Sequence, residues 1–184
     1  MLALLALIAV PLLSPPEPCW TRANAVQLEH RVSPLDSTTV ALGDDSVKVC
    51  YGSPSIRGRK IMGKLVPYNE PWRLGANEAT TISVPFAVQF AGVRLDAGMY
   101  SLYVVPIGGS WKIYVNRSAK RWGIPIDNGV RNQDIASHSV RTEQTRDTVQ
   151  ALKMTFTPPQ KNASELVIEW ETTRVRLPIQ RTKE

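Results

Sequence analysis

The chain has 184 residues, of which 43% are hydrophobic and 21% are charged, and its formal net charge is +6. This length and composition predict one globular domain with a sizeable apolar core and exclude a disordered or fibrous chain. The cations are scattered along the sequence and the aromatic residues do not alternate with them. Nucleic acid is therefore not expected as a partner.

Residues 1–25 have the features of a secretory signal peptide. Leu2 to Ser14 are nearly all apolar, over a length that is too short to span a bilayer. Ala23-Asn24-Ala25 then places small residues at the two positions that a signal peptidase reads. Cleavage after Ala25 predicts a mature domain over residues 26–184, in the periplasm or secreted, with no transmembrane segment.

The two cysteines, Cys19 and Cys50, lie on opposite sides of this cleavage point. Pro16-Glu17-Pro18 precedes Cys19 where a lipobox would require small residues, so a lipid anchor is not expected. Because cleavage removes Cys19, the mature chain is predicted to contain no disulfide. Cys50, within an apolar strand pattern, is predicted to be an unpaired core residue.

Short β-strands separated by turns account for most of the remaining chain. The pattern predicts strands at 27–33, 38–42, 46–51, 79–84, 86–90, 93–95, 99–105, 111–115, 147–157, 164–171 and 173–179. The last two strands are expected to form a hairpin, and residues 116–139 a polar excursion with one helical turn near 131–136. No amphipathic helix of ten or more residues is expected. This pattern is typical of an all-β antiparallel sandwich, jelly-roll-like or barrel-like, with long ordered loops and little helix.

The loop from Ser53 to Thr81 interrupts the strand pattern. Its prolines and glycines exclude a helix interior or a central strand. It also carries apolar residues, including Ile61 and Trp72, that a disordered linker would lack. A long ordered loop with apolar anchors and exposed cations is typical of a functional surface.

Several ordered blocks of the sequence resemble a bacterial family of exported domains of unknown function, DUF2911. The blocks are Arg57-Gly-Arg-Lys-Ile-Met-Gly63, Leu65-Val-Pro-Tyr68, Trp72-Arg-Leu-Gly-Ala-Asn-Glu-Ala-Thr-Thr81, Ala97-Gly-Met-Tyr-Ser-Leu-Tyr103 and Ile168-Glu-Trp-Glu-Thr-Thr-Arg-Val175. The resemblance extends over roughly Ser33 to Ile179. It implies an all-β domain of the cell envelope, and it brings no catalytic residues that can be carried over to this chain.

One group of candidate site residues is Trp72, Arg73, Asn77 and Glu78. Arginine binds carboxylates or phosphates through its planar fork, and tryptophan offers a flat face to a sugar ring or a cation. Glu78 is a candidate general base. The alternative interpretation is structural, with Arg73 and Glu78 as a buried ion pair and Trp72 as an apolar plug.

A second group, Arg57, Arg59 and Lys60, forms with Lys64 the densest basic patch of the chain. The patch is a candidate surface for an anionic ligand or envelope component, and the alternative is a solvated basic turn. The two histidines, His30 and His138, lie far apart in sequence without further ligand motifs. No metal and no other cofactor are therefore expected.

Three functions are consistent with these residues. The first is a non-catalytic module that binds a ligand or partner through the loop 53–81. The second is a hydrolase acting on a saccharide or acyl substrate with Glu78 and Arg73. The third is a structural module of the cell envelope. The sequence leaves open whether the protein is an enzyme.

Overall fold

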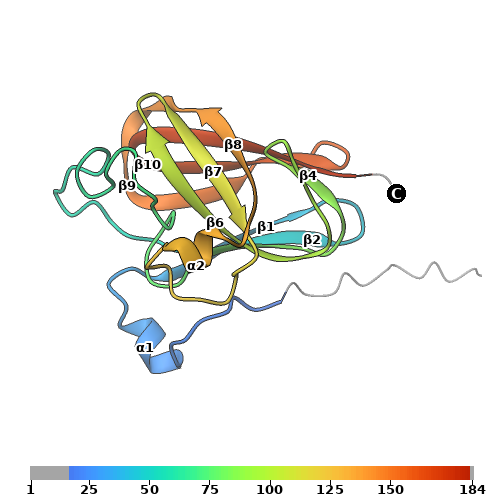
Figure 1. Ribbon diagram of the computed structural model, residues 1–184, viewed down its shortest axis with the longest axis horizontal. Helices are drawn as coiled ribbons and strands as arrows, with labels where there is room; N and C mark the ends of the chain where they lie inside the picture. The colour runs from blue at the N-terminus through green and yellow to red at the C-terminus, as the bar shows by residue number, and fades with distance from the viewer. Residues whose placement is uncertain (1–16, 183–184) are drawn as a thin grey trace, which may run out of the picture.

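The computed structural model describes residues 17–182, which fold into two packed antiparallel β-sheets (Figure 1). The predicted apolar stretch of the leader, Leu2 to Ser14, lies outside the described residues. The larger sheet has six strands in the order β1-β2-β3-β6-β7-β8. They are β1 (Leu35–Ala41), β2 (Ser46–Gly52), β3 (Thr80–Val84), β6 (Gly98–Ile107), β7 (Ser110–Asn116) and β8 (Asp134–Arg141).

The smaller sheet has four strands in the order β5-β4-β10-β9. They are β4 (Val88–Phe90), β5 (Val93–Leu95), β9 (Glu143–Phe156) and β10 (Ala163–Arg181). The two sheets do not join into a closed barrel. The predicted all-β sandwich is therefore confirmed.

The core lies between the two sheets and follows the alternation of each strand. In β7, Trp111, Ile113 and Val115 are buried, while Lys112 and Tyr114 between them are partly exposed. In β10, every second residue is buried, both before and after the midpoint of the strand. Alternation of this kind places one face of each strand in the core and leaves the other in solvent.

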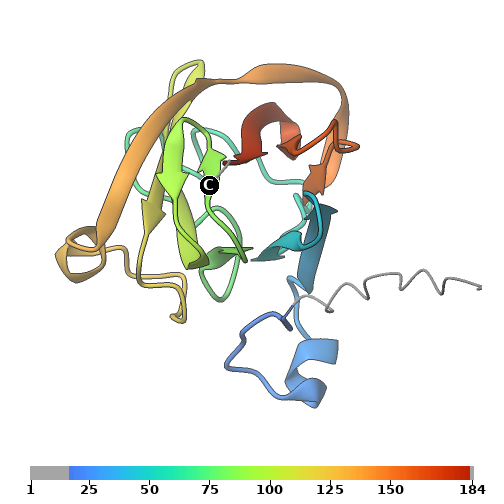
Figure 2. The same cartoon turned by 90° about the vertical axis from the view of Figure 1, so that its right-hand side faces the viewer.

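β8 and β9 connect the two sheets, and Figure 2 shows this orange segment crossing from one sheet to the other. β9 then wraps around the end of β10. Its first residues, Glu143 and Gln144, pair with the second half of β10, and its last residues, 153–156, pair with the first half.

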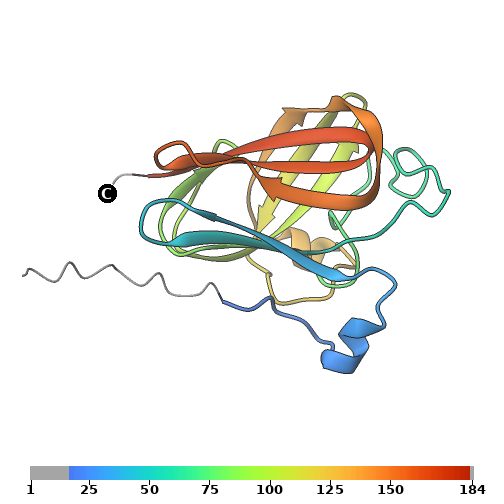
Figure 3. The ribbon, with the colours of Figure 1, turned by 180° about the vertical axis from the view of Figure 1, so that it is seen from behind.

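β10 reverses direction at Glu171, which has a positive φ of 55°. Its two halves lie side by side (Figure 3), and the Arg181 amide donates to the carbonyl of Asn162. The hairpin predicted for the end of the chain is thus present, with its tip at Glu171–Thr173.

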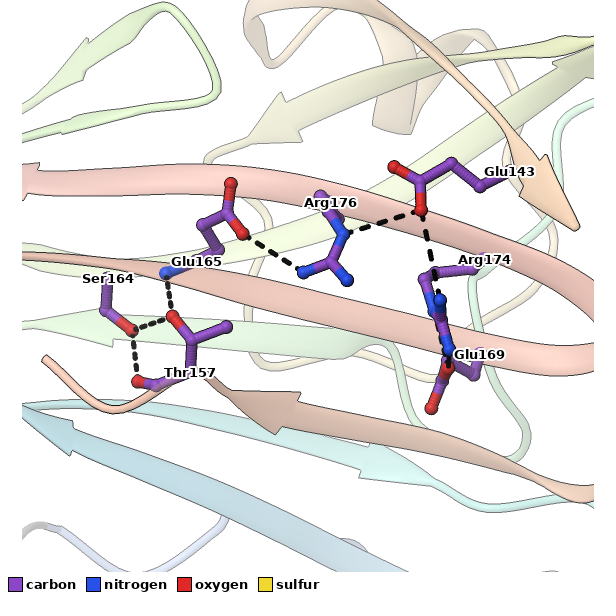
Figure 4. A network of polar contacts seen from close by, with 7 residues as sticks. All are labelled: Glu143, Thr157, Ser164, Glu165, Glu169, Arg174 and Arg176. Atoms are coloured by element: carbon purple, nitrogen blue, oxygen red, sulfur yellow. Dashed lines mark hydrogen bonds and ion pairs between the residues drawn. The ribbon is translucent and has the colours of Figure 1, made fainter. Parts of the chain in front are cut away.

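A row of alternating charges holds the two halves of β10 and the start of β9 together on the outer surface (Figure 4). Arg176 lies 3.1 Å from Glu165 and 3.5 Å from Glu143, and Arg174 lies 2.6 Å from Glu169. These pairs are partly exposed, so each contributes little to stability on its own.

Residues 17–32, called the N-terminal strap below, differ from the sequence-based expectation. The strand predicted at 27–33 is wrong, since the strap contains a short helix, α1 (Ala25–Glu29). The reason is a capping box, in which Asn24 accepts from the Gln27 amide and Gln27 accepts from the Asn24 amide.

Cys50 was predicted to be unpaired in a chain cleaved after Ala25, and in the uncleaved chain it is paired. Cys50 in β2 forms a disulfide with Cys19 of the N-terminal strap. The pairing joins the strap to an interior strand of the six-stranded sheet.

The remaining helix, α2 (Asn128–Arg131), lies slightly before the predicted helical turn and is capped by the side chain of Asp127. Neither helix in the described part of the chain has the length and apolarity needed to cross a membrane.

Candidate ligand-binding surface

The loop 53–81 leaves β2 and returns to β3, and its first part is attached to β9. The Ser53 hydroxyl donates to the carbonyl of Leu152, and the Ile56 amide donates to the carbonyl of Gln150, each at 2.7 Å. The last residue of β2, Gly52, packs tightly against Ala76 in the later part of the loop. A Cβ on Gly52 would lie 2.1 Å from the carbonyl oxygen of Ala76, so only glycine fits there.

The middle of the loop is attached to the tip of β10. The Glu171 carboxylate accepts hydrogen bonds from the amides of Ile61 and Met62, at 3.1 and 3.2 Å. Glu171 has a positive φ because it lies at the turn of β10. Each of the two amides bonds to a different oxygen of its carboxylate. Glu171 is therefore a fixed anchor of the loop.

An open depression of about 580 Å³ lies between the loop and the tip of β10, and we call it the loop depression. It is lined on the loop side by Ile56, Lys60, Met62, Gly63 and Tyr68, and on the side of β9 and β10 by Gln144, Thr148, Glu171, Thr172 and Thr173.

Tyr68 is the aromatic residue of the loop depression and remains 47% exposed. Its ring lies against Gly63, where an added Cβ would come within 2.8 Å of Cε2. The cation of the depression, Lys60, is also exposed. The surface thus combines an aromatic ring, a positive charge and several hydroxyl groups.

The predicted basic patch is divided by the structure. The side chains of Arg57 and Arg59 donate to backbone carbonyls, Arg57 to Val32 at 3.0 Å and Arg59 to Ser55 at 2.8 Å. Only Lys60 of the three predicted cations lines the loop depression. The two arginines are exposed and bond to backbone of the N-terminal strap and of the loop, respectively.

Trp72 is partly buried and packs against the core. Its ring stacks on Trp170 of β10 with centroids 5.6 Å apart, and it meets the edge of Trp111 of β7 at 5.7 Å. Its backbone pairs with Val104 of β6. Trp72 therefore joins the loop to both sheets, which agrees with the interpretation as an apolar plug.

Arg73 and Asn77 contact backbone groups. Arg73 donates from Nε to the carbonyl of Gly75 at 3.2 Å, and its stem lies against Gly123. Burial lowers the pKa of Arg73. Asn77 donates to the carbonyl of Ser33 at 3.0 Å. Neither residue lines the loop depression.

Glu78 is 4% exposed and does not pair with Arg73, contrary to the structural alternative predicted from the sequence. Its partner is Arg31 of the N-terminal strap, which donates two hydrogen bonds of 2.6 and 2.7 Å. The Thr21 hydroxyl and the Arg22 amide donate to the same carboxylate, at 2.9 and 3.0 Å.

These contacts determine the protonation state of Glu78. Burial raises the pKa of its carboxyl group, but the hydrogen bonds from Arg31, the Arg22 amide and Thr21 outweigh burial and lower the pKa to about 2. A carboxylate that is ionised and fully hydrogen-bonded at neutral pH is poorly suited to accept or donate a proton in catalysis. In this arrangement its contacts join the N-terminal strap to the sandwich.

Several residues that form the contacts of Glu78 and the loop depression were not predicted from the sequence. Arg31 lies 47 residues before Glu78, and no local pattern connects the two. Tyr68 occurred in a family-like block without a chemical signal of its own, and Glu171 was considered only as one of several acids that could converge in space. In the described part of the chain, no group of three or more His, Cys, Asp or Glu residues is placed to hold a metal ion.

Fold and surface together define an all-β sandwich with a long, firmly anchored loop that forms one wall of an open polar depression. The model of the family described as "Protein of unknown function (DUF2911)" matches residues 33–179. The chain belongs to this family, which confirms the resemblance found in the sequence. No curated protein and no solved structure matches the chain.

Proposed function

We propose that the protein is an exported, non-catalytic binding module whose ligand occupies the loop depression. The observation that supports this proposal is the joint presence of Tyr68 and Lys60 in an open depression of about 580 Å³. The depression is large enough for one or two sugar rings. Its walls are anchored to β9 and β10, so the surface is largely formed before a ligand binds.

The chemistry of the lining favours an acidic saccharide. An exposed tyrosine ring provides a flat apolar face and a hydroxyl group, which together suit a sugar ring. Gln144, Thr148 and Thr173 add polar groups that can bond to sugar hydroxyls. Lys60 supplies a positive charge, whereas the lining acid, Glu171, is already bonded to two amides. The net charge of +6 further favours an anionic ligand.

The hydrolase alternative lacks comparable support. It requires Glu78 to exchange protons, yet the contacts of Glu78 hold its pKa at about 2. Neither Glu78 nor Arg73 lines the loop depression. A binding module is therefore the function that we put forward.

The test is isothermal titration calorimetry. The purified protein is titrated with a uronic-acid oligosaccharide and, separately, with the neutral counterpart of that sugar. We expect the acidic sugar to bind more tightly than the neutral one. Tyr68→Ala and Lys60→Gln should each weaken binding by about tenfold or more, and Tyr68→Phe should retain much of it.

Lys64→Gln is the matched control for Lys60→Gln, because it removes the same charge from a lysine that does not line the loop depression. Equal weakening by both lysine variants would indicate diffuse electrostatics and contradict the assigned site. Absence of binding at millimolar concentrations of either sugar would overturn the saccharide proposal and favour the structural envelope module.

A further inference from the structure

The N-terminal strap is attached to the β-sandwich at both of its ends. At its start, Cys19 is covalently bound to Cys50 of β2, and Lys48 of the same strand donates from Nζ to the carbonyl of Glu17 at 2.9 Å. At its end, Arg31 reaches the buried carboxylate of Glu78. Between these points, the capping box stabilises helix α1 of the strap.

Glu78 depends on the strap for its hydrogen bonds. The donors from other residues are the Thr21 hydroxyl, the Arg22 amide and the Arg31 guanidinium, all of which belong to the strap. Hydrogen bonds to an ionised carboxylate are stronger than those between neutral groups, so losing these partners lowers the stability of the fold. The sandwich and the strap are thus parts of one polar network.

Cleavage of the leader after Ala25 would dismantle most of this arrangement. It would remove Cys19, Thr21 and Arg22 together, leaving Cys50 without its partner and Glu78 with Arg31 alone. We infer that the N-terminal strap is a permanent part of the exported domain, held to it by the Cys19–Cys50 disulfide, which we call the latch. The leader is then removed N-terminal to Cys19 rather than after Ala25. The inference rests on the proposed export but not on the proposed ligand.

Formation of the latch is a two-electron oxidation. The thiols of Cys19 and Cys50 lose two protons and two electrons as the sulfur–sulfur bond forms. The electrons reduce the disulfide of a thiol-disulfide oxidoreductase of the envelope to a dithiol, by way of a mixed disulfide. Such oxidants act in the compartment to which an exported chain is delivered.

The first experiment determines the start of the mature chain and the state of its cysteines. The full chain, with its own leader and a C-terminal tag, is expressed in bacteria, purified, alkylated without reduction under denaturing conditions, and measured by intact mass and peptide mapping. We expect a product that retains Cys19, takes up no alkylating agent and yields one peptide pair joined through Cys19 and Cys50. A product that begins at Val26 or later, or alkylated Cys50, would overturn the inference.

The second experiment measures what the latch does for the fold. The chain has two cysteines, so a reductant acts on this bond alone. Reduction of the wild type should lower Tm by about 10 °C, and Cys19→Ser should reproduce that shift and be insensitive to reductant. An unchanged Tm after complete reduction would contradict a latching role.

A third comparison separates a latched strap from a disulfide that stabilises β2 alone. Thr21→Val removes one donor to Glu78 and leaves both cysteines in place, and it is expected to lower Tm by a few degrees in the oxidised protein. In the Cys19→Ser background the same substitution should have clearly less effect, because the strap is no longer held against Glu78. Full additivity of the two substitutions would show that the disulfide and the Glu78 contacts are independent.

These outcomes are distinct from those of the sugar titration. Loss of the latch changes thermal stability and the mass of the mature chain, whereas a wrong ligand assignment changes neither.

Discussion

Glu78 illustrates how far a single residue can be understood from sequence. It was a candidate site residue because it occurs in the same short block as Trp72 and Arg73, and its side chain is indeed buried. Its partner was assigned to the wrong arginine, because Arg31 reaches it from 47 residues away across the fold. Long-range pairs of this kind leave no periodic pattern in the sequence.

The lowered pKa of Glu78 makes stability depend on pH. A carboxyl group whose pKa is lower in the folded chain contributes stability above its ordinary pKa of 4.5, and this stability is lost as pH falls toward the folded value of about 2. Between pH 5 and pH 2 the wild type should lose about 2–3 kcal/mol more unfolding free energy than Glu78→Gln. Urea unfolding of both proteins at several pH values measures the difference.

The glutamine variant should itself be less stable at pH 7, by about 3 kcal/mol, because Arg31 is left buried without a carboxylate. Parallel pH profiles for the two proteins would mean that other acids account for the acid sensitivity.

At the scale of elements, the strands were the most predictable part of the molecule. The alternation in β7 and the turn signals around β1 and β2 indicate their structure directly. The N-terminal strap was predicted poorly, since its helix depends on two side chains and its attachment depends on a distant cysteine. The loop depression was predicted only in outline: the loop was recognised, but the wall formed by β9 and β10 was not.

The attachment of the loop to the tip of β10 gives the next prediction. Glu171→Gln leaves one of the two amides of Ile61 and Met62 without an oxygen partner, since a carboxamide has one acceptor oxygen. We expect a loss of about 1–2 kcal/mol in unfolding free energy and faster hydrogen exchange at these two amides.

Glu169→Gln is the matched control, because it changes the same side chain on the same strand. Its partner is the partly exposed Arg174, so a loss below about 1 kcal/mol is expected, with unchanged exchange at Ile61 and Met62. Equal effects of both substitutions would argue against Glu171 as the anchor of the loop.

At the scale of the whole molecule, Trp72 connects three parts of the chain. It joins the loop 53–81 to Trp111 in one sheet and to Trp170 in the other. Trp72→Ala should therefore reduce unfolding free energy by about 2–3 kcal/mol through the lost contacts, below the range for a fully buried tryptophan because this side chain is partly buried. Near-ultraviolet circular dichroism should also lose the signal of the stacked tryptophan pair.

Trp122→Ala provides the comparison, since Trp122 is 37% exposed and its ring is in neither of these aromatic contacts. Its effect on stability should be clearly smaller. Similar losses for both tryptophans would indicate that Trp72 does not hold the sheets together.

The disulfide of the N-terminal strap also has a mechanical consequence. A force applied to the chain ahead of Cys19 would pass through the sulfur bridge directly to Cys50. The segment between the two cysteines, which are 31 positions apart, would carry no tension. At most about 110 Å of contour length is thereby shielded from extension. The tension would enter the larger sheet at β2, which is flanked by β1 and β3, rather than at its edge strand. A domain tethered through its N-terminal side would resist pulling at an interior strand, where several backbone hydrogen bonds share the strain.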